Sequence, residues 1–223
     1  MDNVKRAIKK ILITAGPTRE MLDPVRFLSN LSTGIMGYTL AEVARRKGYR
    51  VTLISGPTAL RPPSGVTFIP VVSAKDLQKV CRREFPKSDA LIMSAAVCDF
   101  TATAPHRQKI ARTRIRQLHL KQTPDVLAGL ARGKGRRLAI GFCLETENWL
   151  ANARKKIVRK HLDGIVANYY TQRHVPFGNR RINAALVARD GKGIHLKGQN
   201  KRQIAVRILK WAEEMSAVKI YSG

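Results

Sequence analysis

A repeated alternation of short apolar runs with amphipathic helical patterns constrains the fold of this chain more than any other feature. Residues 10–16 and 50–55 are apolar runs that stop at Gly-Pro steps, as buried strands of a parallel sheet do. The alternation continues with apolar runs at 90–97, 138–143 and 164–168 and with helical patterns at 34–47, 74–85, 123–131, 148–161 and 201–215. Strands that alternate with helices predict a parallel sheet covered by helices on both faces.

The C-terminal part of the chain predicts a different kind of strand pairing. Residues 182–188 and 193–196 flank an Asp190-Gly191 step, which favours an antiparallel hairpin. We therefore expect a Rossmann-like, three-layer α/β domain with a mostly parallel sheet and an antiparallel hairpin at one edge. The expected domain covers residues 1–223 as a single unit. Polar loops are expected at 18–33 and at about 100–117, and the second of these is expected to be a mobile flap.

The charge of the chain is strongly unbalanced. It carries 42 Lys and Arg residues against 15 Asp and Glu residues, a formal net charge of +27. Such a surface attracts anions in general, among them phosphate-bearing small molecules, nucleic acids and acidic lipids, without selecting one class. A solvated basic surface with no specific partner accounts for the charge equally well, so the identity of any anionic ligand stays open.

The cysteine pattern and the hydropathy of the chain indicate its cellular compartment. Cys81, Cys98 and Cys143 are isolated from one another and form no metal-ligand spacing with the 5 histidines. This pattern favours a reduced, cytoplasmic protein without a protein-bound metal. No apolar run approaches the ~20 residues of a membrane span, and the N-terminus lacks the apolar core of a secretory signal.

Polar clusters follow four of the predicted parallel strands, at residues 16–19, 95–100, 141–146 and 167–168. The carboxyl ends of parallel strands meet at one edge of a sheet, where α/β proteins bind ligands. Four clusters at one edge predict a nucleotide-sized site. A nicotinamide cofactor fits less well, because no GxGxxG follows the first strand and the second strand ends in Ser55 rather than in an acidic residue.

Several residues near these clusters have both a functional and a structural interpretation. The turn from Gly34 to Gly37 opens a helix whose N-terminus would suit a phosphate, or its glycines simply allow close helix–strand packing. Lys109 could cover a triphosphate or stabilise charge that develops in an acyl transfer, or it faces solvent. Lys156 and Lys160 share one helix face and could hold phosphates, although such pairs usually face water.

The remaining candidates carry weaker signals. Asp99 could accept hydrogen bonds from a base or a ribose, or cap a turn. Asn30 is an amide in a polar loop, and the residues around it give no separate indication of function. Thr123 is expected to cap the helix that begins with Pro124 at its first turn.

One long pattern at residues 14–20 and 23–34 is specific enough to indicate a family. The matching segments continue in order at 95–100, 109–110, 124–127, 141–142, 145–146, 156–163 and 167–168. This set closely resembles the bacterial phosphopantothenate–cysteine ligases, which are often fused behind a flavin decarboxylase. Because no room remains upstream for a decarboxylase, the chain resembles the monofunctional form.

The resemblance implies a two-step reaction that belongs to coenzyme A biosynthesis. A nucleoside triphosphate, CTP in the bacterial branch, activates the carboxylate of 4′-phosphopantothenate as an acyl-cytidylate and releases pyrophosphate. The amine of L-cysteine then attacks the acyl group, and CMP leaves. Magnesium offsets the charge of the triphosphate and is held largely by phosphates and water. The family resemblance also implies a homodimer.

The resemblance also implies roles for individual residues. Asn30 matches the asparagine that holds the acyl intermediate, and Lys109 matches the flap lysine required for its turnover. The nucleotide-contacting positions of the family correspond here to Met93, Ser94, Ala95, Asp99, Lys109, Pro124, Asp125, Val126, Leu127, Phe142, Lys156 and Lys160.

Three departures from the family pattern bear on the choice of nucleotide. Ile35 stands where a lysine is usual, which removes one anion contact. Ala111 interrupts the basic pattern of the flap, and Cys143-Leu144 replaces a pair of alanines. ATP therefore stays open as a co-substrate beside CTP.

Two other classes of function are weighed against the ligase. A nucleic-acid-binding module on the same fold is favoured by the charge but opposed by an aromatic content of only 6%, since bases are commonly held by stacking. An NAD(P)-type oxidoreductase lacks its glycine fingerprint.

Overall fold

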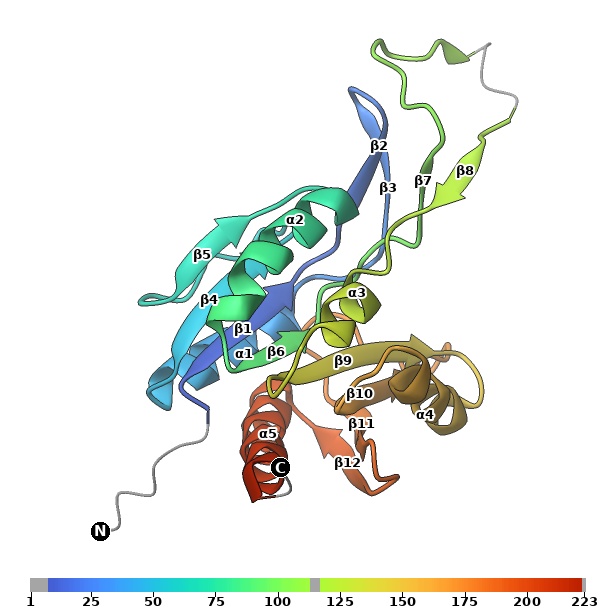
Figure 1. Cartoon of the computed structure of the whole chain (residues 1–223). Helices are drawn as coiled ribbons and strands as arrows, with labels where there is room; N and C mark the ends of the chain where they lie inside the picture. Colours follow the sequence, from blue (N-terminus) through green and yellow to red (C-terminus); the bar gives the residue numbers. More distant parts are fainter. Residues whose placement is uncertain (1–7, 113–116, 222–223) are drawn as a thin grey trace.

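The computed structural model describes residues 8–112 and 117–221, and its main feature is one eight-stranded sheet (Figure 1). The strands stand in the order β12-β11-β10-β9-β6-β1-β4-β5, parallel from β10 to β5 and antiparallel at β11 and β12. The predicted mostly parallel, Rossmann-like sheet with an antiparallel edge hairpin is confirmed. Its strands are β1 (Lys10–Ala15), β4 (Arg50–Ser55), β5 (Thr67–Pro70), β6 (Ala90–Met93), β9 (Leu138–Glu145), β10 (Gly164–Tyr169), β11 (Ile182–Ala188) and β12 (Gly193–Gln199).

Helices cover both faces of this sheet, as the alternation of elements predicts. Successive strand residues point to opposite faces, so Ile11 and Ile13 of β1 join one core cluster and Leu12 joins the other. Helices α1 and α5 pack on the first face, whereas α2, α3 and α4 pack on the second. The helices are α1 (Ile35–Arg46), α2 (Ala74–Glu84, followed by a 3-10 turn at Phe85–Lys87), α3 (Val126–Arg132), α4 (Trp149–Arg159) and α5 (Lys201–Tyr221).

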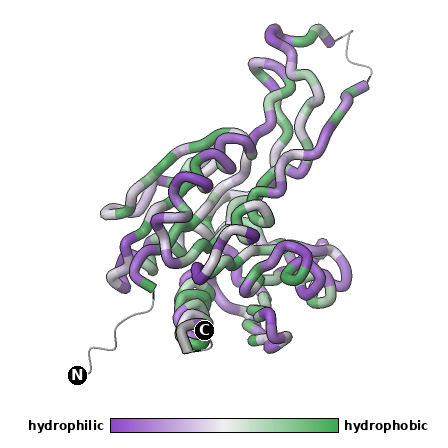
Figure 2. The backbone as a smooth tube through the Cα atoms, in the orientation of Figure 1, coloured by the Kyte–Doolittle hydropathy of each residue, from purple (hydrophilic) through white to green (hydrophobic). Residues whose placement is uncertain are grey.

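An arm projects from the carboxyl edge of the sheet (Figure 1). It consists of the hairpin of β2 (Arg19–Asp23) with β3 (Arg26–Ser29) and of the pair β7 (Phe100–Ala102) with β8 (Leu120–Gln122). The two halves of the arm are joined by the His106 N–H, which donates to the Leu22 carbonyl at 2.9 Å. Figure 2 shows hydrophilic and hydrophobic residues interspersed along this arm.

The arm corrects two sequence-based expectations. The segment predicted as a polar loop at 18–33 contains the β2–β3 hairpin, and the predicted flap at about 100–117 begins with a strand, β7. Both were missed because the arm lies outside the core: Met21 is 36% exposed, Phe27 42% and Phe100 49%, so their strands lack a fully apolar face. Residues 113–116 of the predicted flap lie outside the described residues.

No helix in residues 8–112 or 117–221 combines the length and the apolar character that crossing a membrane requires.

Candidate functional site

The ends of β1 and β6 continue side by side beyond the sheet and form the floor of the candidate site. The Ala96 N–H donates to the Gly16 carbonyl at 2.9 Å, and the Thr18 N–H donates to the Ala96 carbonyl at 3.1 Å. The Ser94 hydroxyl donates to the Thr14 carbonyl at 2.7 Å. The first two predicted polar clusters are therefore neighbours at the carboxyl edge of the sheet.

The first turn of α1 packs directly on this floor. A Cβ at Gly37 would lie 2.5 Å from the Ala15 Cβ and 2.6 Å from the Ser94 Oγ, so only glycine allows this approach of helix to strand. The close-packing interpretation is thus confirmed for Gly37. Gly34 precedes the helix with a left-handed φ of 80°, and no side chain caps the helix there. The N–H groups of the first turn, which have no intrahelical partners, lie at the edge where a ligand would bind.

Asn30 is tied to the same floor. Its Nδ2 donates to the carbonyls of Ala96 at 3.2 Å and Val97 at 3.0 Å, and its side chain is exposed. The predicted catalytic amide therefore lies where the end of β3 meets the loop after β6. Because its Nδ2 donates to two backbone carbonyls, the orientation of the amide is fixed.

A buried carboxylate at the turn of the β2–β3 hairpin holds the middle of the flap. Asp23 Oδ1 accepts from the N–H groups of Val25 and Arg26, both at 2.9 Å. Asp23 Oδ2 accepts from the Arg26 Nε at 2.9 Å and from the Ile110 N–H at 3.2 Å. The Arg26 Nη2 also donates to the Ile110 carbonyl. We call this set of Asp23, Arg26 and Ile110 the flap clamp.

The Asp23 carboxylate of the flap clamp is held in its ionised form. Desolvation by burial raises the pKa of Asp23, but hydrogen bonds from the N–H groups of Val25, Ile110 and Arg26, together with the Arg26 charge, outweigh it and lower the pKa below the usual range. Asp23 consequently stays ionised and keeps its partners wherever the protein is folded near neutral pH.

The clamp sets the position of Lys109, because Lys109 directly precedes Ile110. Asn30 lies four residues after Arg26 and one residue beyond the end of β3, about 13 Å away for extended backbone. Within one chain the two proposed catalytic residues therefore lie at opposite ends of β3. Their meeting across a nucleotide stays a prediction, one that needs flap movement or a second copy of the chain.

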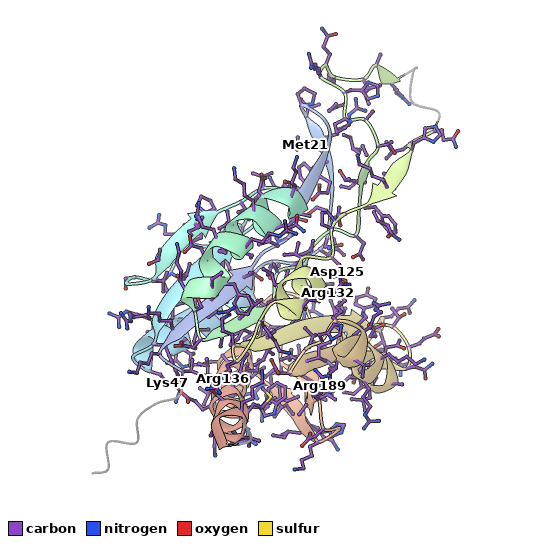
Figure 3. The ribbon with its side chains drawn as sticks, in the orientation of Figure 1. Met21, Lys47, Asp125, Arg132, Arg136 and Arg189 are labelled. Carbon is purple, nitrogen blue, oxygen red and sulfur yellow. The ribbon has the colours of Figure 1, made fainter. Side chains whose placement is uncertain are left out.

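A second group of predicted residues gathers where α3 begins and α4 ends. Lys160 Nζ lies 3.0 Å from Asp125 Oδ2, and Lys156 pairs with Glu145 at the end of β9. Desolvation raises the pKa of Asp125, but the Ala128 N–H and Lys160 outweigh this and lower it. Asp125, labelled in Figure 3, lies near the base of the arm. Both predicted lysines thus reach the carboxyl edge, each beside a carboxylate.

The start of α3 corrects another expectation. The N-cap is Asp125, whose Oδ1 accepts from the Ala128 N–H at 3.1 Å, rather than Thr123. The Thr123 hydroxyl instead donates to the Cys98 carbonyl at 2.6 Å and anchors the loop after β6. Sequence alone could not separate two good capping residues that stand two positions apart.

The other predicted nucleotide-contacting residues differ in what they can offer a ligand. Met93, Val126 and Leu127 are buried in the core, so they would present backbone rather than side chain. Ala95 and Phe142 are half-buried, while Asp99 and Pro124 are exposed. The contacts of the flap clamp and of Glu145 at this edge were not predicted, because they depend on partners distant in sequence.

Cys81 and Cys143 are buried thiols, an environment that disfavours the nucleophilic thiolate. Burial raises the pKa of the Cys81 thiol to about 12 and that of Cys143 to about 11, which keeps both protonated. In residues 8–112 and 117–221, no three His, Cys, Asp or Glu side chains gather in a way that could hold a metal ion.

Comparison with known proteins places this geometry in a family. The model of the DNA/pantothenate metabolism flavoprotein C-terminal domain (DFP) matches residues 7–215. The chain belongs to the DFP family. The coenzyme A biosynthesis bifunctional protein CoaBC of Bacillus subtilis (strain 168) is 40% identical over 217 residues, which cover 96% of this DFP chain and 53% of the relative. The chain thus spans about half the length of the curated relatives it matches.

Solved structures agree with the DFP assignment. A crystal structure of the C-terminal domain of CoaBC superposes with a TM-score of 0.80 at 38% identity, covering 95% of this chain and 98% of that one. Cab2 mutant H337A in complex with phosphopantothenate-cysteine superposes with a TM-score of 0.75 at 19% identity, covering 96% and 89%. At that identity the second likeness supports the fold alone.

Proposed function

We propose that this DFP domain is a phosphopantothenate–cysteine ligase that works through an acyl-nucleotide. The observation that carries the proposal is the convergence, at one sheet edge, of Asn30, the residues after β6, and the Asp125–Lys160 pair, in a chain 38% identical to the C-terminal domain of CoaBC. The substrates would be 4′-phosphopantothenate, L-cysteine and CTP, with ATP as the other candidate nucleotide.

The chemistry requires an activated carboxylate, because a free carboxylate is a poor electrophile. Transfer of the nucleotidyl group to the carboxylate oxygen would release pyrophosphate and create a good leaving group. Asn30 would position the acyl group through its backbone-anchored amide, and Lys109 would bring a cation over the developing charge. Lys156 and Lys160 would bind the nucleotide, in exchange for their carboxylate partners or together with them.

In this proposal, magnesium would enter the site bound to the triphosphate. Mg²⁺ is commonly bound by one or two carboxylates together with phosphates and water, and Asp99 offers an exposed carboxylate at the edge. The ion would neutralise phosphate charge, while the residues named above orient the reacting groups.

The direct test supplies purified protein with 4′-phosphopantothenate, cysteine, magnesium and one nucleoside triphosphate at a time. Pyrophosphate release and the mass of the product are measured. We expect sustained release with CTP, and only about one equivalent per site when cysteine is omitted, because the acyl-nucleotide then waits for its nucleophile. Absence of release with every nucleotide would remove the ligase proposal.

We further propose that the chain forms a homodimer through the arm. Several large apolar side chains are exposed on the arm and beside it, and burying such a surface favours association. They are Met21, Val25, Phe27, Leu31, Phe100, Leu118 and Leu120. Sedimentation is expected to give twice the chain mass, and Phe27→Glu is expected to shift the protein to monomer. An unchanged mass for that variant would exclude this face.

A further inference from the structure

A buried cation, Lys201, lies at the amino end of α5. It begins α5, is 6% exposed, and its Nζ donates to the Pro176 carbonyl at 2.7 Å. The other lysine buried in residues 8–112 and 117–221 is Lys134, which has Asp163 at 3.2 Å. No carboxylate in these described ranges forms an ion pair with Lys201, although buried lysines are almost always paired.

This cation lines a small pocket next to the candidate site. The pocket has a volume of about 60 Å³ and is formed by Lys201 with Thr33, Gly34, Gly37, Ser94 and Phe177, among others. Thr33 and Gly34 continue the loop that carries Asn30, and Ser94 belongs to the floor of the site. Pockets that hold whole small-molecule ligands usually measure about 300–1,000 Å³, so this pocket suits one small group rather than a nucleoside.

Two independent features give this pocket a positive potential. The ammonium group of Lys201 provides a full charge, and the uncapped N-terminus of α1 adds its N–H groups and helix dipole. Because the ammonium group and the helix N-terminus are both positive, neither stabilises the other. Burial lowers the pKa of Lys201 to about 8, which shows how poorly the protein alone accommodates the charge. An anion in the pocket would compensate both.

We propose that Lys201 is a substrate-binding residue whose ammonium group holds a phosphoryl group of a substrate against the first turn of α1. This inference rests on the proposed ligase function. Two substrates of that reaction carry phosphoryl groups, the nucleoside triphosphate and the phosphorylated acid, and both offer the chemistry that the pocket accepts.

The test compares Lys201→Met with Lys201→Arg, which keeps the charge, and with Lys197→Met. Lys197 lies four residues earlier on β12 and is exposed, so its replacement removes one surface charge without touching the pocket. The KM values for the nucleotide and for phosphopantothenate are measured separately, with unphosphorylated pantothenate as an additional acid. Binding of pyrophosphate and of inorganic phosphate is followed by calorimetry. Lys201→Gln, which keeps a donor for the Pro176 carbonyl, replaces Lys201→Met if that variant does not fold.

We expect Lys201→Met to raise one KM about tenfold or more, because a charge-assisted hydrogen bond to a phosphate is lost. Lys201→Arg should retain part of the affinity, and Lys197→Met should match the wild type. A raised KM for the nucleotide with weaker pyrophosphate binding identifies the triphosphate as the ligand. A raised KM for phosphopantothenate, with lost preference over pantothenate, identifies the acid.

Other outcomes overturn the inference. One is a folded Lys201→Met protein whose KM values are unchanged. Another is a Lys201→Met protein in which only kcat or thermal stability falls. A third is a rise in KM for Lys197→Met as large as that for Lys201→Met. If the wild type shows no ligase activity, the proposed function fails, but calorimetry still decides about Lys201. Pyrophosphate and phosphate binding that is equal in wild type and Lys201→Met, or absent from both, then overturns the assignment.

Discussion

Replacement of Asp23 by Asn is expected to lower the turnover of the proposed ligase about 100-fold while the protein remains folded. The amide keeps an oxygen for the N–H groups of Val25 and Arg26, so the hairpin turn survives. It offers a donor where Oδ2 now accepts from Arg26 Nε and Ile110 N–H, so the flap clamp opens. Misplacing a catalytic group by about 1 Å is enough to cost about 100-fold, and Lys109 is the group that the clamp positions.

A matched control and a double variant make this prediction specific. Asp190 likewise accepts a backbone N–H two residues on, from Lys192 at 3.0 Å, and pairs with that lysine, but it lies in the exposed turn between β11 and β12. Asp190→Asn should leave turnover unchanged. If Asp23 acts through the flap, adding Asp23→Asn to Lys109→Gln should cause little further loss. A full additional 100-fold loss in the double variant would show that Asp23 acts elsewhere.

Replacement of Gly56 by Ala is expected to lower the free energy of unfolding by about 3 kcal/mol, the upper end of the usual cost of overpacking. A Cβ at Gly56 would lie 1.9 Å from the Pro17 carbonyl oxygen and 2.7 Å from the Pro17 carbonyl carbon. Both atoms belong to the backbone, so no side chain can turn away to make room. The end of β4 would have to separate from the extension of β1 that forms the floor of the site.

Gly129→Ala provides the comparison for this prediction. Gly129 lies inside α3, and a Cβ added there would meet no atom within 4 Å apart from its chain neighbours and the backbone of its own helix. Alanine at an exposed helix position should raise stability by about 0.5–1 kcal/mol, because glycine loses more backbone entropy on folding. Chemical denaturation of both variants measures the difference. A Gly56→Ala protein as stable as the wild type would show that the two segments are not in contact as described.

The sequence was most informative where one local pattern decides one element. The apolar run at 10–16 and the helical spacing at 34–47 appear in the structure as β1 and α1, with ends that differ by one residue. The Asp190-Gly191 step marks the β11–β12 hairpin as expected. Prediction failed at the arm, because the sequences of β2 and β3 each place two apolar residues next to each other and so lack the apolar–polar alternation that marks a half-buried strand.

For the site, the sequence indicated residue types and an edge of the sheet, but not partners. That Lys160 pairs with Asp125, 35 residues away, depends on the packing of α3 and α4 on one face of the sheet. The link from Asp23 to Ile110 spans 87 residues and exists only because two loops rise together from neighbouring strands. No sequence pattern indicates either of these two contacts.

By itself, the sequence determined the order and type of the core elements, the edge at which polar groups gather, and the family resemblance. These depend on local propensity and on the periodic burial of side chains, which are properties of consecutive residues. Only the tertiary structure decided which partners the charges meet: Asp23 with the Ile110 N–H, Lys160 with Asp125, and Lys201 with no carboxylate in the described residues. A charge interacts through space, so its partner follows from the packing of strands and helices rather than from distance along the chain.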